Sequence, residues 1–343
     1  MRNLVSIQII EDPRPIEGAD NILLARVLGW ELIVRKGEFQ AGDCCVYYEV
    51  DSFLPISDQR YEFLHKSSYR NNEFMGEGLR IKTMKLRGCI SQGLALPVAL
   101  FPELADCQVG EDVTERLGVI KWEIPEMTGA APKQKGSKPY GIPTTDETRV
   151  QSRDSLRQQL LGLPYYISTK MDGSSCTIYN VNSNIGVCSR NYELHDDDTS
   201  VMWRVFHKNG LAQRMQQAEN LVIQGEFCGP DIQKNPLGLK NYEFYVFNIF
   251  EYGEDGTLRL MGLDEMLETC EKHQLNSVPI EERGACFDYT LEQLLERARG
   301  KYPNGRDKEG IVIRPLEPVY CPLLNKSLSF KVINNDYLLK EKG

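Results

Sequence analysis

The chain has 343 residues, which predicts two or three domains, and its formal net charge is −9. Hydrophobic residues make up 41% and charged residues 26% of it, as in ordinary folded proteins, so disorder over most of the chain is excluded. No apolar run approaches the length that spans a bilayer, and the N-terminus lacks a signal-peptide pattern, so we expect no membrane partner. The acidic balance means that any contact with nucleic acid must come from a local basic patch.

The first third of the chain reads as short strands and turns. Strand candidates lie at 4–10, 22–27, 30–36, 44–50, 79–86 and 92–96. About five such strands within roughly 100 residues suggest a small closed barrel, of which the OB-fold is the commonest version that binds nucleic acid.

A stretch rich in Pro, Gly and Lys at 126–143 is interpreted as a linker. Beyond it we expect helices near 146–161, 199–217 (with Thr199 as the N-cap), 263–273 and 290–299, and strands near 165–181, 221–227, 242–251, 311–314 and 328–333, followed by a short terminal helix. This order predicts an α+β domain built on antiparallel sheets with flanking helices. No Gly-rich phosphate loop occurs, so phosphates must be held by side chains.

The cysteines and histidines give no local catalytic or metal signature. The ten cysteines are scattered without a Cys-x-x-Cys pair, and the four histidines are dispersed. This pattern indicates reduced thiols in a cytoplasmic compartment, with nucleus and organelles left open, and argues against structural zinc.

The sharpest local feature is Lys170-Met171-Asp172-Gly173, which lies between two strand candidates. Asp-Gly alone would indicate a hairpin turn. Three further charged residues, however, stand in or beside apolar strands: Glu226, Glu309 and Lys331. Together they are the residue types that phosphoryl chemistry needs.

This ordered set resembles the motifs of the covalent nucleotidyltransferases, that is, ATP-dependent ligases and capping enzymes. The matching segments are Lys170–Gly173, Ser189-Arg190-Asn191, Glu226, Phe244–Asn248, Glu309-Gly310 and Lys331. The stretch Arg80–Gly88, followed by Ser91-Gln92-Gly93, resembles the N-terminal OB module of the RNA ligase branch that seals 3'-OH/5'-phosphate nicks in duplexes. Thr145–Gln151 resembles the start of the catalytic domain of that branch.

The resemblance implies an OB-fold-like domain at 1–125 that assists with nucleic acid and metal, the linker at 126–143 and a nucleotidyltransferase domain at 144–343. It implies an ATP-dependent RNA ligase of RNA repair, working through a covalent lysyl-AMP and an RNA-adenylate. It also implies Mg²⁺ or Mn²⁺ as cofactor, nicked or broken RNA in a duplex as partner, and a monomer.

Site roles follow from chemistry together with the resemblance. The expected catalytic residues are Lys170, Asp172, Glu226, Glu309 and Lys331. The expected ATP or AMP contacts are Thr169, Lys170, Gly173, Arg190, Glu226, Phe247, Val312 and Lys331. The expected metal ligands, largely through waters, are Asp172, Glu226, Glu251 and Glu309. The expected RNA or phosphate contacts are Arg80, Lys82, Lys85, Arg87, Arg149, Arg190 and Lys326.

The proposed nucleophile must be neutral to attack phosphorus, whereas an ordinary lysine with a pKa of about 10.4 is charged at pH 7. We expect burial, Lys331 and a bound cation to lower the pKa of Lys170. Two positions depart from the family pattern. Asn248 stands where many relatives have Asp, and Ile333 stands where a second lysine is usual, which leaves Lys326 as a substitute.

Some of these residues also have a purely structural interpretation. Phe247 could be a core aromatic residue, and the basic run Arg80, Lys82, Lys85 and Arg87 could be a solvated edge strand. At the level of function, the alternatives are a DNA ligase, a capping guanylyltransferase or a non-catalytic OB-type RNA-binding protein. The first two normally carry an OB domain after the catalytic domain, whereas only twelve residues follow Lys331 here. The intact charged set argues against the third.

Overall fold

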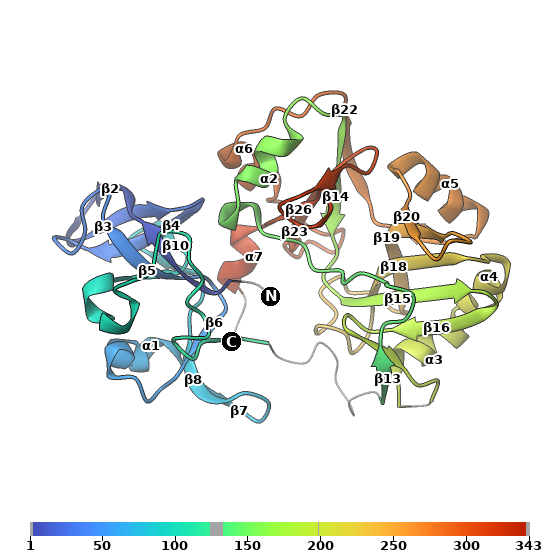
Figure 1. Cartoon of the computed structure of the whole chain (residues 1–343), viewed down its shortest axis with the longest axis horizontal. Coiled ribbons are helices and arrows are strands. Elements are labelled where there is room, and N and C mark those ends of the chain that lie inside the picture. Colours follow the sequence, from blue (N-terminus) through green and yellow to red (C-terminus); the bar gives the residue numbers. More distant parts are fainter. Residues whose placement is uncertain (1–2, 124–132, 198, 341–343) are drawn as a thin grey trace. The chain divides into compact units, whose positions relative to one another are not determined.

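The computed structural model describes residues 3–123, 133–197 and 199–340 (Figure 1). The chain divides into two compact units. Unit 1 comprises Met1–Ile124, Gln151–Asp154 and Asn335–Gly343, and unit 2 comprises Pro125–Val150 and Ser155–Asn334. In the part of the chain that the structure describes, no helix is both long and apolar enough to cross a membrane.

Unit 1 is built almost entirely from short strands. Its sheets have the orders β1-β5-β11, β2-β3-β4, β12-β6-β8-β7 and β9-β10. The strands are β1 (Val5–Ile9), β2 (Glu11–Ile16), β3 (Ala19–Val27), β4 (Trp30–Arg35), β5 (Cys44–Tyr48), β6 (Ser52–Leu54), β7 (Tyr69–Asn72), β8 (Gly76–Arg80), β9 (Met84–Leu86), β10 (Cys89–Ser91), β11 (Leu94–Pro97) and β12 (Ile120–Lys121). Short helical segments complete the unit: η1 (Gln59–Leu64), α1 (His65–Ser68), η2 (Val98–Leu100), η3 (Pro102–Leu104) and α7 (Asn335–Lys340).

Alternation of side chains along these strands buries two apolar clusters. One gathers around Val5, Val46 and Leu79, and the other around Trp30, Leu32 and Tyr47. The strand expected at 79–86 is interrupted, because β8 ends at Arg80 and β9 begins only at Met84.

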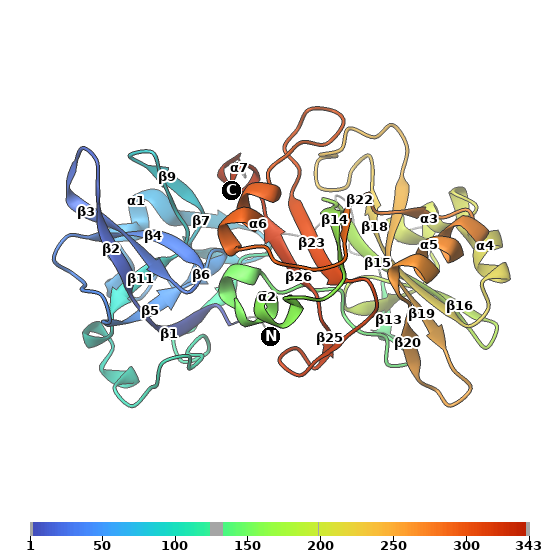
Figure 2. The same ribbon diagram turned by 90° about the horizontal axis from the view of Figure 1, so that it is seen from above.

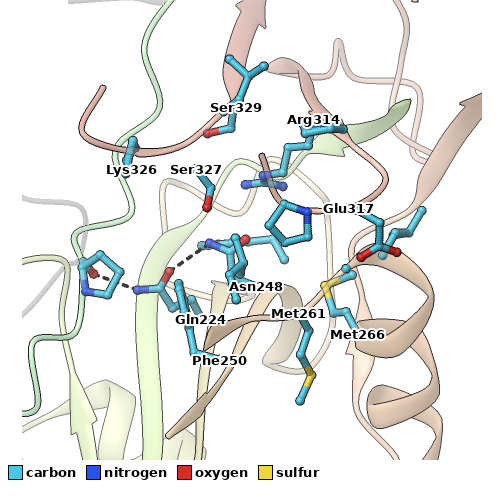
Figure 3. Close-up of a pocket in the computed structure, with 18 of the residues that line it drawn as sticks. Gln224, Asn248, Phe250, Met261, Met266, Arg314, Glu317, Lys326, Ser327 and Ser329 are labelled. Atoms are coloured by element: carbon cyan, nitrogen blue, oxygen red, sulfur yellow. Dashed lines mark hydrogen bonds between the residues drawn. The ribbon is translucent and has the colours of Figure 1, made fainter. Parts of the chain in front are cut away.

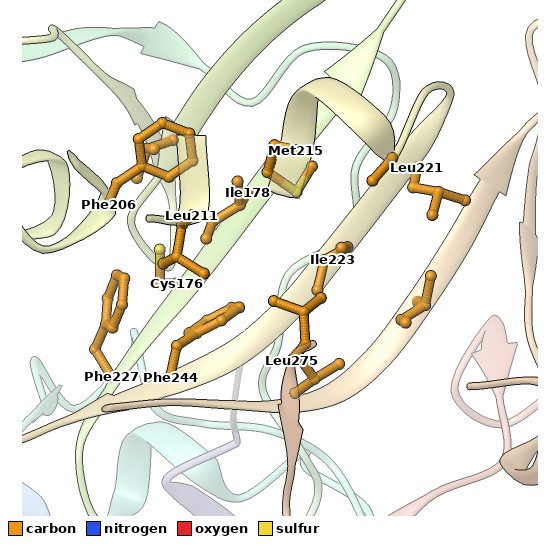
Figure 4. Close-up of a cluster of buried hydrophobic side chains, with 14 of the residues drawn as sticks. Cys176, Ile178, Phe206, Leu211, Met215, Leu221, Ile223, Phe227, Phe244 and Leu275 are labelled. Atoms are coloured by element: carbon orange, nitrogen blue, oxygen red, sulfur yellow. The ribbon is translucent and has the colours of Figure 1, made fainter. Parts of the chain in front are cut away.

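The larger sheet of unit 2 has the order β13-β17-β16-β15-β18-β19-β20, with β21 beside β19. Its strands are β13 (Gln134–Ser137), β15 (Ser174–Val181), β16 (Asn184–Cys188), β17 (Tyr192–Leu194), β18 (Leu221–Cys228), β19 (Glu243–Tyr252), β20 (Leu258–Leu260) and β21 (Asn276–Ser277). Three helices supply apolar side chains to the core against this sheet: α3 (Val201–Lys208), α4 (Leu211–Gln217) and α5 (Leu263–Lys272). Figure 4 shows Phe206, Leu211 and Met215 in one apolar cluster with Cys176, Ile178 and Ile223.

The smaller sheet of unit 2 has the order β22-β14-β23-β26 (Figure 2). Its strands are β14 (Tyr165–Lys170), β22 (Ile280–Gly284), β23 (Gly310–Pro315) and β26 (Phe330–Ile333). Helices α2 (Ser155–Leu160) and α6 (Leu291–Arg297) pack on it through Leu156, Leu160 and Leu294. The remaining elements are η4 (Val150–Ser152) and the hairpin β24 (Tyr320–Cys321)–β25 (Lys326–Ser327).

Several boundaries differ from expectation. The helix expected at 199–217 splits into α3 and α4 because Gly210 takes a left-handed conformation with φ of 67°, and Ser200 rather than Thr199 caps α3. Only Ser155–Leu160 of the helix expected at 146–161 is α-helical. Within the expected linker, Gln134–Ser137 forms β13, which pairs with β17. Residues 126–132 of that linker lie outside the described residues.

Candidate active site

The candidate site lies within unit 2, on the sheet faces that helices leave uncovered. In antiparallel sheets, residues directly opposite one another share a face. In the smaller sheet, Ser168 on β14, Val312 on β23 and Lys331 on β26 are opposite one another. In the larger sheet, Ser175 on β15 is opposite Glu226 on β18. The odd-numbered neighbours Ile311 and Ile313 pack into the helix-covered core, so the charged residues are left on the other face.

Lys170 and Glu309 form the centre of this site. Lys170 is the last residue of β14, where it pairs with Gly310, the first residue of β23. This register brings the Lys170 Nζ to 2.6 Å from the Glu309 Oε2. Both side chains are mostly buried, with exposed fractions of 21% and 18%. A charge-assisted hydrogen bond of this length in a half-desolvated position is strong.

The carboxylates decide the protonation state of Lys170. Burial disfavours its charged form, but the charges of Glu309 and Glu226, the hydrogen bond that Lys170 donates to Glu309 and the charge of Asp172 outweigh that penalty. They hold the pKa of Lys170 above its ordinary value. Carboxylates rather than cations dominate around the ammonium in this arrangement. The expected lowering of the Lys170 pKa also depends on a bound cation and stays a prediction.

Lys331 shows the opposite shift. Burial, the charge of Lys170 and the charge of Arg149 lower the pKa of Lys331 to about 7. Its backbone N–H donates to the Thr148 carbonyl at 2.9 Å, and Arg149 forms a parallel bridge with it. The segment before η4 therefore brings Arg149 to the strand that carries Lys331.

Gly173 allows the chain after Lys170 to pass close to β18. A Cβ at this position would clash with the Phe227 carbonyl oxygen and would lie 2.8 Å from the Cys228 Sγ. Gly310 plays the same part at the other side of the pair, because a Cβ there would clash with the Val332 carbonyl oxygen, and its φ is 153°. The two motif glycines thus set how closely the strands approach around Lys170.

Gly173→Ala is expected to destabilise unit 2 by about 1–3 kcal/mol, because the added methyl group meets backbone that cannot move without disturbing β18. The measurement is the unfolding midpoint in denaturant. Gly253→Ala is the matched control, since the nearest atom to its added Cβ is the Asp255 Oδ1, the end of an exposed side chain. Equal midpoints for the two variants would contradict this explanation of Gly173.

A cavity of about 630 Å³ continues along the same faces (Figure 3). Phe247 is among its lining residues; it is the extra residue at the bulge where Gln224 pairs with Asn248 and Gly225 with Val246. The Arg314 guanidinium carbon lies 5.9 Å from the centre of the Phe247 ring. The amide of Asn248 donates to Gln224 at 3.0 Å, and the Gln224 amide donates to the Pro143 carbonyl at 2.8 Å.

A second charged cluster borders this cavity. The Arg314 guanidinium donates to the Glu147 carboxylate at 2.8 Å, and Glu147 also accepts from the Ser329 hydroxyl. The Lys326 Nζ donates to the Asp146 carbonyl at 2.6 Å and lies 3.7 Å from Glu147. Arg190 lies 4.0 Å from the Asp146 carboxylate. Burial opposes ionisation of Glu147, but Arg314 and Lys326 outweigh it and lower its pKa.

Three predicted site residues lie elsewhere or face away. Glu251 is at the far end of β19 from Tyr245, the partner of Glu226, and forms a surface ion pair with Arg259 at 2.7 Å; its assignment as a metal ligand is therefore wrong. The Thr169 hydroxyl donates to Glu281 at 2.8 Å, because odd positions of β14 face away from the site. Its side chain is thus not turned toward a nucleotide.

Arg80 in unit 1 is also misassigned as a phosphate contact. Its side chain is 3% exposed, pairs with Asp51 at 2.9 Å and lies over the Trp122 ring at 5.2 Å. Strand alternation cannot reveal this, because the break after β8 separates Arg80 from the rest of the run. Lys85 and Arg87 are exposed on the β9–β10 hairpin, and Lys82 is half-buried.

Sequence reasoning missed the polar residues that lie behind the site. Glu281 on β22 contacts Lys308, Arg297 and Thr169, and the Tyr302 hydroxyl contacts the backbone at Lys170 and Glu309. The only sequence signal for these residues was the position of Lys308 directly before Glu309. The partners of these residues come from segments that local patterns do not connect.

Comparisons with known proteins agree with this geometry. A family model described as an OB-fold domain matches residues 4–98, and one described as RNA ligase matches residues 163–333. Among curated proteins, none matches the chain.

Several solved structures are similar to this chain over nearly its full length. The structure of Naegleria gruberi RNA ligase with pyrophosphate is 36% identical, with a TM-score of 0.88, and the match covers 99% of each chain. A variant of the same ligase with ATP and Mn is 36% identical, with a TM-score of 0.89 and coverage of 98% of this chain and 99% of that one. Another variant, with AMP and Mn, is 36% identical at a TM-score of 0.89 and covers 99% of both. Identity at this level over the full length confirms the fold and the resemblance predicted from the motifs: the chain belongs to the RNA ligase family, as an ATP-dependent RNA ligase with an N-terminal OB-fold domain.

Proposed function

We propose that this ligase joins a 3'-OH to a 5'-phosphate in broken RNA through a covalent lysyl-AMP on Lys170 and an RNA-adenylate. The observation that carries the proposal is the cluster around Lys170. Its ammonium lies 2.6 Å from Glu309, with Glu226 and Asp172 close enough to shift its pKa and with Lys331 beside it.

In the first step, the Lys170 Nζ attacks the α-phosphorus of ATP. A phosphorus–nitrogen bond forms, the bond to the bridging oxygen breaks, and pyrophosphate leaves. The lysine must give up a proton, and Glu309 is hydrogen-bonded to it at 2.6 Å. Lys331 is suited to neutralise negative charge that develops on the phosphates.

In the second step, an oxygen of the RNA 5'-phosphate attacks the phosphorus of lysyl-AMP, the phosphorus–nitrogen bond breaks, and Lys170 regains a proton. In the third step, the 3'-OH gives up its proton to solvent and its oxygen attacks the 5'-phosphorus. The phosphodiester bond forms, the phosphoanhydride bond breaks, and AMP leaves. Each step is a displacement at phosphorus, so the contribution of the protein is alignment and charge neutralisation. Naegleria gruberi RNA ligase has been solved with ATP, AMP and pyrophosphate, which supports ATP as the AMP donor here.

The donor set suits a hydrated divalent cation. Asp172, Glu226 and Glu309 offer the carboxylate oxygens that Mg²⁺ and Mn²⁺ prefer. Within residues 3–123, 133–197 and 199–340, no group of three His, Cys, Asp or Glu side chains is close enough to hold a metal ion directly. We propose that the cation is bound largely through waters. When bound, the cation would neutralise phosphate charge and offset the carboxylates that keep Lys170 protonated. Naegleria gruberi RNA ligase has been solved with Mn.

We place the purine of ATP against Phe247, with Val312 on the opposite side. Phe247 lines the cavity, and Val312 shares the sheet face of Lys331. Arg190 is suited to the ribose or to the 3' strand end. Lys326 donates to the Asp146 carbonyl and lies near the Glu147 carboxylate. We propose that it fixes the edge of the cavity at these residues and contacts phosphate only through its exposed part.

The exposed hairpin of unit 1 is proposed to bind RNA phosphates. Lys85→Ala combined with Arg87→Ala is expected to weaken RNA binding and to reduce the slope of log affinity against log salt by about 1 to 2. Formation of lysyl-AMP should stay unchanged, because these residues belong to unit 1. Binding titrations at several salt concentrations measure this, with Lys121→Ala as the control on the same unit. An unchanged salt slope would contradict the assignment.

We further propose an OB-fold-like domain over 1–125, a linker over 126–143 and a nucleotidyltransferase domain over 144–343. We also propose a monomer acting on RNA duplexes in the cytoplasm. All ten cysteines are free in the structure, which supports a reducing compartment.

Sealing assays test the proposed reaction. With ATP and Mg²⁺ or Mn²⁺, nicked RNA duplexes should be sealed faster than the same break in single strands or in all-DNA duplexes. Faster sealing of DNA nicks would favour the DNA ligase alternative, and transfer from GTP to a 5' end would favour capping chemistry.

A further inference from the structure

We propose that Tyr302 is a positioning residue for the nucleophile and, together with Glu281, holds Lys170 and Glu309 in register for attack on ATP. This inference rests on the proposed function of Lys170. It assigns a task to two residues that lie behind the candidate site.

The first observation is the hydroxyl of Tyr302. It donates to the Lys170 backbone carbonyl at 2.8 Å and accepts from the Glu309 backbone N–H at 3.2 Å. The β14–β23 ladder ends at the Lys170–Gly310 pair, so no ladder bond holds Glu309 against Lys170. The Tyr302 hydroxyl connects the backbones of Lys170 and Glu309 at the point where their side chains leave the sheet.

The turn that carries Tyr302 is itself fixed. The Tyr302 N–H donates to the Arg306 carbonyl at 2.8 Å, and the Gly305 N–H donates to the Tyr302 carbonyl at 2.9 Å. Tyr302 is only 4% exposed. Burial and the nearby charge of Glu309 raise its pKa, so the phenol stays a neutral donor.

The second observation is a carboxylate that bridges Thr169 and Lys308, the residues directly before Lys170 and Glu309. Glu281 accepts from the Thr169 hydroxyl at 2.8 Å and from the Lys308 Nζ at 2.6 and 2.7 Å. Arg297 also donates to Glu281, at 3.0 Å. Lys308 is 5% exposed, so this ion pair is well shielded from water.

The two bridges act on adjacent positions. Glu281 ties the side chains of residues 169 and 308, and Tyr302 ties the backbones of residues 170 and 309. Both are therefore directed at the relative placement of the nucleophile and its carboxylate. Displacements of about 1 Å at a reacting centre can cost about a hundredfold in rate, so a bridge of this kind has kinetic consequences beyond its contribution to folding.

Tyr302→Phe tests this inference because it removes the hydroxyl and keeps the ring. Lysyl-AMP formation is measured in a single turnover over a range of ATP concentrations, and joining is measured with pre-adenylylated nicked RNA, in which Lys170 is not the nucleophile. We expect the maximal rate of lysyl-AMP formation to fall at least about tenfold more than the rate of joining, with little change in half-saturating ATP.

Two variants complete the experiment. Tyr289→Phe is the matched control, because its hydroxyl bonds Glu282 at 2.9 Å and does not touch Lys170 or Glu309; it should leave both rates near wild type. Glu281→Gln should reproduce the selective loss, and the thermal midpoint of each variant is recorded. If the wild type forms lysyl-AMP but Tyr302→Phe slows lysyl-AMP formation and joining equally, or slows neither, the inference is overturned. A wild type that forms none would overturn the proposed function as well.

Discussion

Lys170→Ala is expected to abolish lysyl-AMP formation and ATP-driven sealing, with a loss of at least about 10⁴-fold, because it removes the group that attacks the α-phosphorus. The same variant should still join RNA whose 5' end is already adenylylated. In that reaction the attacking group is the 3'-OH and the leaving group is AMP, so the lysine is not consumed. The two reactions are measured side by side on one nicked RNA duplex.

The matched control is Lys272→Ala, which removes an exposed lysine from α5 in the same unit. It should seal from ATP at the wild-type rate. Sealing from ATP by Lys170→Ala would show that the nucleophile lies elsewhere. Loss of joining from pre-adenylylated RNA would show that the variant had lost the site and not only the nucleophile.

Lys331→Met is expected to slow lysyl-AMP formation by about 10²- to 10³-fold, because it removes a basic group that interacts with Lys170 while keeping an unbranched side chain of similar length. Its β26 position opposite Val312 should be preserved, so the thermal midpoint should change little. Single-turnover labelling gives the rate. A rate within about threefold of wild type would exclude Lys331 from charge neutralisation.

The lowered pKa of Lys331 predicts a pH-dependent proton linkage. A lysine with a pKa of about 7 is mostly neutral at pH 8 and mostly charged at pH 6. Polyphosphate beside it favours the charged form, so binding of a non-cleavable ATP analogue should take up nearly one proton at pH 8 and few at pH 6. Calorimetry in buffers of different ionisation enthalpy measures this uptake. Uptake that persists in Lys331→Met would contradict the assignment.

The central residues stand out in the sequence because each ends, precedes or interrupts a strand of strongly apolar character. The structure brings Lys170, Glu309 and Lys331 close together, and their roles in the reaction stay predictions. Lys170 closes β14, Glu309 precedes β23, and Lys331 stands between the buried residues Phe330 and Val332 on β26. Antiparallel pairing then converts these sequence positions into one shared face. The order of motifs supplied the family, and the comparisons confirmed it.

What the sequence did not predict depends on contacts between distant segments. Arg80 belongs to a basic run, but its side chain is buried in unit 1 and forms an ion pair with Asp51. Glu251 forms an ion pair with Arg259. Tyr302 and Glu281 reach the site from a turn and an edge strand, with no local pattern to mark them.

The charge state of Lys170 likewise follows from how closely the carboxylates approach, which spacing along the chain does not give. In three dimensions Glu309, Glu226 and Asp172 outweigh the effect of burial on the pKa of Lys170. Burial, together with the charges of Lys170 and Arg149, explains why Lys331 has a lowered pKa.

The central claim is that Lys170 becomes covalently bound to AMP. The most direct measurement incubates the purified protein with ATP labelled on the α-phosphate and a divalent cation, resolves it on a denaturing gel, and maps the modified peptide by mass spectrometry. The account predicts a label from ATP and not from GTP, located on Lys170, and intact mass identifies any protein already adenylylated before the assay. A label at another residue, or a protein that carries AMP neither before nor after incubation, would contradict it.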